Sequence, residues 1–302
     1  MKKIKIAGFV LLASLLAVSC LPENQSIGSA GKTFINITPD SYNMVAFDAK
    51  AVPQSGILFE VRKVVSNEAD MNTPSTVVLN YDTDGSIMAA YNSANKTTYI
   101  PLPTSLGTTS PAVTSGTITL NFGAGEFAKI VTINVPNAGN FDFSKSYALA
   151  FKLSSVSGVG TLSAAVGKTV VCEVLAKNKY DGIYMMKGFI MRPGDTGGLE
   201  GYFTDHKKFM TTAGASSISM APNQLWANAT GVGGIGTWTI TVNETNNKIT
   251  VTDPIAVRWL MDPTYPNRYD PVKKAFYFKV NWGAADPYNR GCVDTLVYVG
   301  PR

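Results

Sequence analysis

Apolar side chains at every second position recur along this chain and restrict it to β-structure. In SYALAFKLSSV, Tyr147, Leu149, Phe151 and Leu153 alternate with small or polar side chains, as in a strand that covers a core with one face. The runs GTITLNF, AKIVTINVP and GILFEVRKVV alternate in the same way. Turn formers separate these runs, among them Asp84-Gly85 and Asn95-Lys96. Short alternating runs between frequent turns, without a long stretch of helical period, predict an all-β fold of antiparallel sandwich or barrel units.

A change in composition divides the chain into two predicted units. The chain has 302 residues, which is enough for two domains of ordinary size. The segment AKNKYDGIY carries Asn178 and Asp181-Gly182, which favour a turn, and an aromatic-rich strand follows it. All four tryptophans lie after this segment. We therefore predict a β-sandwich over residues 33–178 and an antiparallel β-barrel over residues 179–302, in which GTWTITVNETNNKITVTD forms a hairpin that turns at Asn246-Asn247.

The first twenty residues predict a bacterial lipoprotein signal. Three lysines precede an apolar stretch from Ile6 to Val18, which is too short to span a hydrocarbon core of about 30 Å. Small residues then lead to Cys20 in LAVSC. We expect residues 1–19 to be removed as a signal peptide, Cys20 to carry the lipid and residues 20–32 to act as a tether. An ordinary secretion signal is the alternative. Lipid chains hold a soluble body at a membrane surface, so this feature predicts a location and no chemistry.

Charge and cysteine content narrow the possible partners. Without the three lysines of residues 1–19, the formal charge falls from +5 to +2, and the basic residues are scattered singly. Nucleic-acid binding needs a basic surface, so we exclude nucleic acid as a partner. With Cys20 assigned to the lipid, Cys172 and Cys292 remain, one in each predicted unit. We expect buried free thiols, with a disulfide as the alternative.

Four segments carry a resemblance to a known family. They are YNSANKTTYIPLP, KTVVCEVLAKN, the junction KYDGIY and the final DTLVYVGPR. Together with the lipoprotein signal, they resemble a family of two-domain surface lipoproteins that accompany Sus-like glycan-uptake systems of gut bacteria. The resemblance implies an immunoglobulin-like sandwich followed by a calycin-like barrel, glycan binding, and an outer-membrane glycan transporter as partner. Surface members carry acidic residues after the lipidated cysteine, whereas CLPENQS contains only Glu23, so the cell surface and the periplasmic face both stay open.

No pattern in the sequence predicts catalysis, a cofactor or a metal site. His206 is the one histidine, and we expect it to lie in a loop. GVGGIG at 231–236 matches a nucleotide fingerprint, but that fingerprint needs a following helix, and TWTITV is strand-like. Asp82 and Asp84 have the spacing of calcium ligands, yet the rest of such a loop is missing, so we expect a hairpin turn. A glycosidase needs two carboxyl groups about 5 to 9.5 Å apart, but the carboxylates at 253, 262, 270 and 286 each precede proline, which favours turns.

Aromatic and polar side chains gather in VRWLMDPTYPNRYDPVKKAFYFKVNWGAADPYNR. A flat ring can stack on the apolar face of a sugar while amide, carboxylate or guanidinium groups bond its hydroxyls. Several of these rings lie in proline-rich loops, where core filling is not their obvious role. The alternative is that the rings form the core or close the barrel end, which we favour for Trp282. The predicted glycan-binding residues are Trp226, Trp259, Asp262, Tyr265, Arg268 and Tyr269.

These features together predict a lipid-anchored, non-catalytic glycan-binding protein of the outer membrane. The sandwich would act as a spacer and the barrel would bind a polysaccharide or oligosaccharide, with the lipid as the only membrane contact. A structural or adhesive surface subunit and a glycoside hydrolase are the alternatives, as is a barrel that encloses a small apolar molecule.

Overall fold

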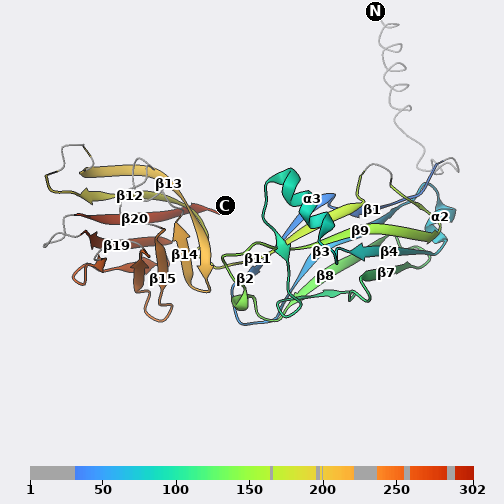
Figure 1. Cartoon of the computed structure of the whole chain (residues 1–302), viewed down its shortest axis with the longest axis horizontal. Coiled ribbons are helices and arrows are strands. Elements are labelled where there is room, and N and C mark those ends of the chain that lie inside the picture. Colours follow the sequence, from blue (N-terminus) through green and yellow to red (C-terminus); the bar gives the residue numbers. More distant parts are fainter. Residues whose placement is uncertain are drawn as a thin grey trace, which may run out of the picture.

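The computed structural model describes residues 31–163, 166–194, 198, 200–220, 237–254, 259–283 and 290–302. Within them the protein is all-β, as predicted, with two facing sheets in the first part and a nearly closed, barrel-like sheet in the second. The two parts lie one after the other along the long axis of the molecule, and the C-terminus lies at the junction between them (Figure 1). The lipoprotein signal with Cys20, and Trp226, lie outside the described residues.

The first sheet of the sandwich has the strand order β10-β1-β3-β8-β6. Apolar side chains of its inner face, such as Ile35, Val61 and Val131, are fully buried. Its strands are β1 (Phe34–Thr38), β3 (Gln54–Val64), β6 (Thr108–Ser110), β8 (Ala128–Val135) and β10 (Thr161–Leu162).

The second sheet has the strand order β2-β11-β9-β4-β7, with β5 paired to β9. The predicted alternation in β9 is confirmed on one face, where Tyr147, Leu149, Phe151 and Leu153 are buried against the facing sheet. β2 runs parallel to β11, so the expectation of a purely antiparallel sandwich is wrong for this pair. The strands are β2 (Ser41–Asp48), β4 (Ser75–Tyr81), β5 (Ile100–Pro101), β7 (Thr117–Phe122), β9 (Tyr147–Gly158) and β11 (Thr169–Lys177).

A helix covers part of the outer face of this second sheet, and it begins at the end of YDTDGS, where the sequence predicted a hairpin turn. It is α3 (Ser86–Asn95), and its Met88 packs on Ala148, Ala150 and Val171. The Asp82 carboxylate accepts hydrogen bonds from the backbone N–H groups of Ile87 (3.2 Å) and Met88 (2.9 Å). The turn interpretation of this aspartate is therefore wrong, because its side chain satisfies the free N–H groups of the helix start. The other helices are α2 (Glu68–Asn72) and a 3₁₀ turn, η1 (Ala138–Asn140).

The second part is one antiparallel sheet in the order β16-β15-β14-β13-β12-β20-β19-β17, with β18 paired to β19. Its inner face is filled by large side chains, including Tyr184, Trp238, Phe278 and Trp282. The burial of Trp282 confirms its predicted core role. The strands are β12 (Gly182–Met191), β13 (Gly201–Gly214), β14 (Ser217–Met220), β15 (Thr239–Val242), β16 (Ile249–Thr252), β17 (Leu260–Met261), β18 (Arg268–Asp270), β19 (Ala275–Trp282) and β20 (Arg290–Gly300).

The predicted hairpin of GTWTITVNETNNKITVTD is present. β15 pairs antiparallel to β16, and Val242 lies opposite Ile249. Asn247, in the connection, has a positive φ of 58°, a conformation that asparagine tolerates well. The turn therefore lies where the two asparagines predicted it.

Both remaining cysteines are buried free thiols, as expected. Cys172 lies on the inner face of β11, and Cys292 lies on the inner face of β20. Burial raises the pKa of both thiols, so neither side chain is a reactive thiolate.

A carboxylate is enclosed in the second part. Asp294 on β20 is 1% exposed, and it lies opposite Gly188 on β12. A Cβ on residue 188 would lie 2.3 Å from an Asp294 carboxylate oxygen, so only glycine leaves room for this group. Burial raises the pKa of Asp294 to about 8, although the Cys292 thiol and the Lys208 ammonium group favour its charged form. Near neutral pH, therefore, this carboxyl group is largely protonated in the folded protein.

This burial predicts an unusual pH dependence of stability. Between about pH 4 and pH 8, Asp294 is ionised in the unfolded chain and protonated in the folded protein. The free energy of unfolding should therefore decrease as the pH rises through this range, by up to about 1.4 kcal/mol per pH unit. Urea unfolding at a series of pH values measures this slope. Asp294→Asn should remove this contribution, whereas Asp205→Asn, at an exposed carboxylate of β13, should leave it. An unchanged slope in Asp294→Asn would contradict the assignment.

Candidate functional site

The turn that contains Asp262 and Asn267 is held by its own polar side chains. The Asp262 carboxylate accepts hydrogen bonds from the backbone N–H (2.8 Å) and the hydroxyl (2.7 Å) of Thr264, and it pairs with the Lys279 ammonium group at 2.8 Å. These bonds hold the pKa of Asp262 well below its usual range. Asn267 donates to the carbonyl of Asp262 at 2.7 Å. The Asp-Pro sequence at 262 makes a turn, as predicted, and its carboxylate is already occupied.

Trp259 and Tyr269 help to close the barrel-like sheet. The Trp259 indole N–H donates to the carbonyl of Val251 on β16 at 2.7 Å, and its ring stacks on Trp282 with centroids 6.0 Å apart. The backbone N–H of Tyr269 donates to the carbonyl of Asn247 at 2.8 Å. These bonds join the segment around β17 and β18 to the other end of the same sheet.

Tyr269 is therefore removed from the predicted stacking residues. Its side chain is 7% exposed, and its ring meets Tyr180 edge-on, with centroids 4.9 Å apart. A sugar needs a free ring face, and this ring is used for packing. The sequence could not distinguish packing from sugar stacking for this residue. A tyrosine that packs between the two ends of a sheet and a tyrosine that faces solvent occur in the same kind of loop.

Arg268 is the exposed one among the predicted residues that the structure describes, and Tyr265, like Trp259 and Asp262, is partly exposed. The Arg268 guanidinium group lies over the ring of Tyr277 on β19, 4.9 Å from its centroid. Arg268 also pairs with Asp270 at 3.3 Å. The structure thus brings together only a small aromatic surface at this edge of the sheet.

The remaining motifs have structural places or lie outside the described residues. His206 lies in β13 and not in a loop, and its ring meets Phe203 edge-on at 5.7 Å. GVGGIG and Asp286 lie outside the described residues. Within the described ranges, no cluster of three histidine, cysteine, aspartate or glutamate side chains is placed to hold a metal ion. In the same ranges, no helix combines the length and apolar character that a membrane span requires.

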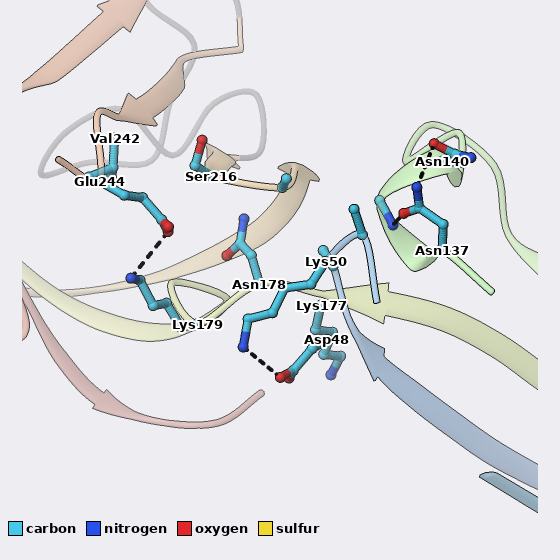
Figure 2. Close-up of a pocket in the computed structure, with 14 residues that line it drawn as sticks. Asp48, Lys50, Asn137, Asn140, Lys177, Asn178, Lys179, Ser216, Val242 and Glu244 are labelled. Atoms are coloured by element: carbon cyan, nitrogen blue, oxygen red, sulfur yellow. Dashed lines mark hydrogen bonds and ion pairs between the residues drawn. The ribbon is translucent and has the colours of Figure 1, made fainter. Parts of the chain in front are cut away.

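A polar cleft lies where the sandwich meets the barrel-like sheet (Figure 2). Its volume is about 620 Å³, within the usual range for ligand sites of about 300 to 1,000 Å³. The sandwich contributes the end of β2, the residues after it and the turn η1, and the second part contributes the start of the linker and the loops after β13 and β15. The lining residues are Asp48, Ala49, Lys50, Ala51, Asn137, Gly139, Asn140, Lys177, Asn178, Lys179, Ala215, Ser216, Val242 and Glu244.

Both hydrogen-bond donors and hydrogen-bond acceptors line this cleft. Lys50 pairs with Asp48 at 2.9 Å, and Lys179 pairs with Glu244 at 3.1 Å; both pairs are well exposed and visible in Figure 2. The amides of Asn137 and Asn140 bond each other at 3.2 Å on the sandwich side. Alanine and glycine lie between these polar groups. Such a surface can both donate hydrogen bonds to and accept them from a ligand rich in hydroxyl groups.

The cleft depends on a tightly bonded linker. The Asn178 side-chain amide donates to the carbonyls of Gly214 (2.8 Å) and Ser217 (2.7 Å), and its oxygen accepts from the Tyr180 N–H at 2.9 Å. The Asp181 carboxylate accepts from the Thr212 N–H at 2.8 Å and pairs with Arg302 at 2.9 Å. These bonds fix the linker to the barrel-like sheet, so one wall of the cleft is pre-formed.

This cleft was not predicted from the sequence, although its polar residues belong to recognisable turn segments. Asn178 and Asn137-Ala138-Gly139-Asn140 have turn-forming composition, and turns were all that this composition predicted. The segments come together only because the second sheet ends at the linker. The one signal in the sequence for a polar site at the junction was the run Lys177-Asn178-Lys179.

Comparisons with known proteins agree on the fold. A family model described only as an N-terminal domain matches residues 33–160, and a search of curated protein sequences found no match. A Bacteroides ovatus protein of unknown function has a similar structure, with a TM-score of 0.53, 12% identity, and coverage of 89% of this chain and 95% of that chain.

Two further solved structures are similar. An auxiliary nutrient binding protein from Bacteroides thetaiotaomicron VPI-5482 has a TM-score of 0.51 and 12% identity over 85% of this chain and 90% of its own. A multidomain protein including DUF1735, from Bacteroides ovatus, has a TM-score of 0.50 and 11% identity over 89% of this chain and 93% of its own. The architecture of this protein is thus shared, along nearly its whole length, with proteins of Bacteroides.

The placement of the two tyrosines predicts different costs of truncation. Tyr269→Ala should lower the free energy of unfolding by about 3 to 5 kcal/mol, because it opens a cavity in the core. Tyr265→Ala should lower it by only about 1 to 2 kcal/mol, because the ring is half-buried. Chemical denaturation of both variants provides the measurement. Equal losses would show that Tyr269 does not seal the seam.

Proposed function

We propose that this protein is a lipid-anchored, non-catalytic component of the cell envelope that binds glycans for a polysaccharide-uptake system. The polar cleft at the junction is the proposed binding site, and its geometry is the observation that carries the proposal. Tyr265 and Arg268, with Tyr277, form a smaller accessory surface. The fold similarity to an auxiliary nutrient binding protein supports this class of function.

The cleft suits a sugar chain better than it suits an apolar molecule. The polar groups that Figure 2 draws come from both parts of the chain and include ammonium, carboxylate and amide groups. Sugars present hydroxyl groups that donate and accept, and both kinds of partner are available here. Because most of these side chains are solvated in the free protein, each contact contributes little, and we expect weak binding that gains from repeated units of one polysaccharide.

A binding role without catalysis fits the carboxyl groups of the structure. A glycosidase needs a carboxyl group of raised pKa that faces its substrate. Asp294 has such a pKa, but it is enclosed by the barrel-like sheet and does not line the cleft. The two carboxylates of the cleft, Asp48 and Glu244, are each paired with a lysine. We therefore propose that the protein binds and does not cleave.

The proposed location rests on the sequence LAVSC and its Cys20. A lipid on this cysteine would attach the protein to the outer membrane, with the cell surface as the proposed side and an outer-membrane glycan transporter as the proposed partner. The lipid is the proposed means of attachment, because several acyl chains bind a bilayer almost permanently.

Removing the lipid acceptor gives a direct test of the location. Cys20→Ser in the full chain should move the protein from the membrane fraction to the soluble fraction, because no acyl chain can then be attached. Cell fractionation followed by immunoblotting measures this, and Cys172→Ser, at a buried thiol, is the matched control. Membrane retention of a Cys20→Ser protein from which residues 1–19 have been cleaved would contradict the lipid anchor.

Filling the cleft tests the glycan site. The mature chain is titrated by calorimetry with a panel of soluble polysaccharides, and release of reducing ends is followed in parallel. Ala215→Trp should lower the affinity at least about tenfold, a loss of about 1.4 kcal/mol, because the ring occupies the cleft. Lys50→Ala with Lys179→Ala should weaken binding as well, since two cleft donors are lost.

Matched variants distinguish the cleft from other surfaces. Arg62→Ala with Lys129→Ala removes two cations from surface ion pairs away from the cleft and should leave the affinity unchanged. Tyr265→Ala reports on the accessory surface. Unchanged affinity in Ala215→Trp would reject the cleft, and absence of binding to every glycan would reject the function. Reducing ends that disappear after one Asp→Asn change would favour a hydrolase.

A further inference from the structure

Three large apolar side chains are exposed at one end of the sandwich. Phe34 is 39% exposed, Val64 is 50% exposed and Phe127 is 53% exposed. Phe34 begins β1 and lies opposite Val64, the last residue of β3. The carbonyl of Phe127 accepts a hydrogen bond from the backbone N–H of Lys63 at 2.8 Å. The backbones of these three residues, here called the apolar end, therefore lie close together at the end of the first sheet, where Phe34 and Val64 share one face and Phe127 lies opposite Lys63.

The chain enters the sandwich at the apolar end. Phe34 follows Cys20 after only the thirteen residues 21–33. Even fully extended, thirteen residues reach at most about 45 Å. A lipid on Cys20 would therefore keep the apolar end within a short distance of the bilayer, at a high effective concentration relative to the membrane surface.

Two ion pairs lie near the apolar end, and the exposed Lys32 lies two residues before Phe34. Arg62 pairs with Glu60 at 2.8 Å, and Lys129 pairs with Glu126 at 2.7 Å. Paired charges of this kind repel neither neutral nor anionic lipid headgroups strongly. Exposed phenylalanine rings next to such pairs suit the boundary between headgroups and acyl chains, where apolar area drives binding.

We propose that Phe34, Val64 and Phe127 rest on the surface of the lipid bilayer to which Cys20 is attached. This inference rests on the proposed lipid anchor and adds a second, protein-borne contact to it. The contact orients the molecule. β3 runs from Gln54, near the cleft side, to Val64 over 11 residues, a rise of about 35 Å, so the glycan cleft is held away from the membrane.

A fluorescent reporter at each end of the sandwich tests this orientation. The mature lipidated protein is placed in vesicles of phosphatidylethanolamine and phosphatidylglycerol that contain a nitroxide-labelled phospholipid. Asn72→Cys, at the exposed end of α2 beside the apolar end, and Ser55→Cys, near the start of β3, each accept the fluorophore. Cys172 and Cys292 are buried and stay unlabelled in the folded protein.

We expect nitroxide quenching to be several-fold stronger at residue 72 than at residue 55. Phe34→Ser with Phe127→Ser should lower the quenching at residue 72 several-fold, while Ile57→Ser, which removes an equally exposed apolar side chain further along β3, should not. Vesicle flotation of each variant shows in the same samples that the protein remains lipid-anchored.

Three outcomes would overturn the inference. Equal quenching at both reporters in floating samples would reject the apolar end as a membrane contact, with the anchor intact. Loss of flotation in the unaltered protein would reject the anchor and with it the contact. The third outcome is a blue-shifted emission of the fluorophore at residue 72 in the absence of vesicles, which Phe34→Ser with Phe127→Ser returns to the wavelength of a solvent-exposed dye. It would mean that another part of this chain covers the apolar end.

Discussion

The bonding of Asn178 and Asp181 determines how the two parts of this protein are joined. Asn178 is 8% exposed, and its side chain bonds three backbone groups of the second part. A buried amide that lost these partners would leave backbone groups unsatisfied, at a cost of about 1 to 3 kcal/mol each. Asp181 links the same turn to Thr212 and to the C-terminal Arg302. The linker is thus part of the barrel-like sheet, and the cleft forms against a fixed wall.

Tyr180 connects the cleft to the closure of the barrel-like sheet. Tyr180, two residues after Asn178, is fully buried and meets Tyr269 edge-on. Its hydroxyl donates to Glu244 in the cleft at 3.3 Å. Packing inside the sheet and the position of a cleft carboxylate therefore both involve the Tyr180 side chain.

The strands and turns of the fold could be predicted from the sequence because their main signals lie in short segments of the chain. The alternation of apolar side chains in β9 reflects the two-residue period of a strand. The asparagines between β15 and β16 reflect the preference of this residue for turns. Both signals depend only on neighbouring residues. α3 was missed because the signals for its start, Asp82 and Gly85, equally suit a hairpin. The parallel pairing of β2 with β11 joins residues far apart in the chain, for which alternation carries no information.

The site was less predictable, because it depends on which surfaces remain open after folding. Trp259, Asp262 and Tyr269 have the chemistry of sugar-binding residues, yet the structure uses them to close the sheet and to fix a turn. Asn137, Lys50 and Lys179 looked like ordinary turn and surface residues, and they line the cleft. A polar cleft between two parts of a chain is a property of their assembly, and no short motif encodes it.

A crystal structure of the mature chain with a bound oligosaccharide would show whether the junction cleft is the glycan-binding site. We expect sugar density in the junction cleft, with hydroxyl groups bonded to the side chains of Lys50, Asn140 or Lys179. Sugar density confined to the surface of Tyr265 and Tyr277, or to a site on the sandwich away from the linker, would contradict it.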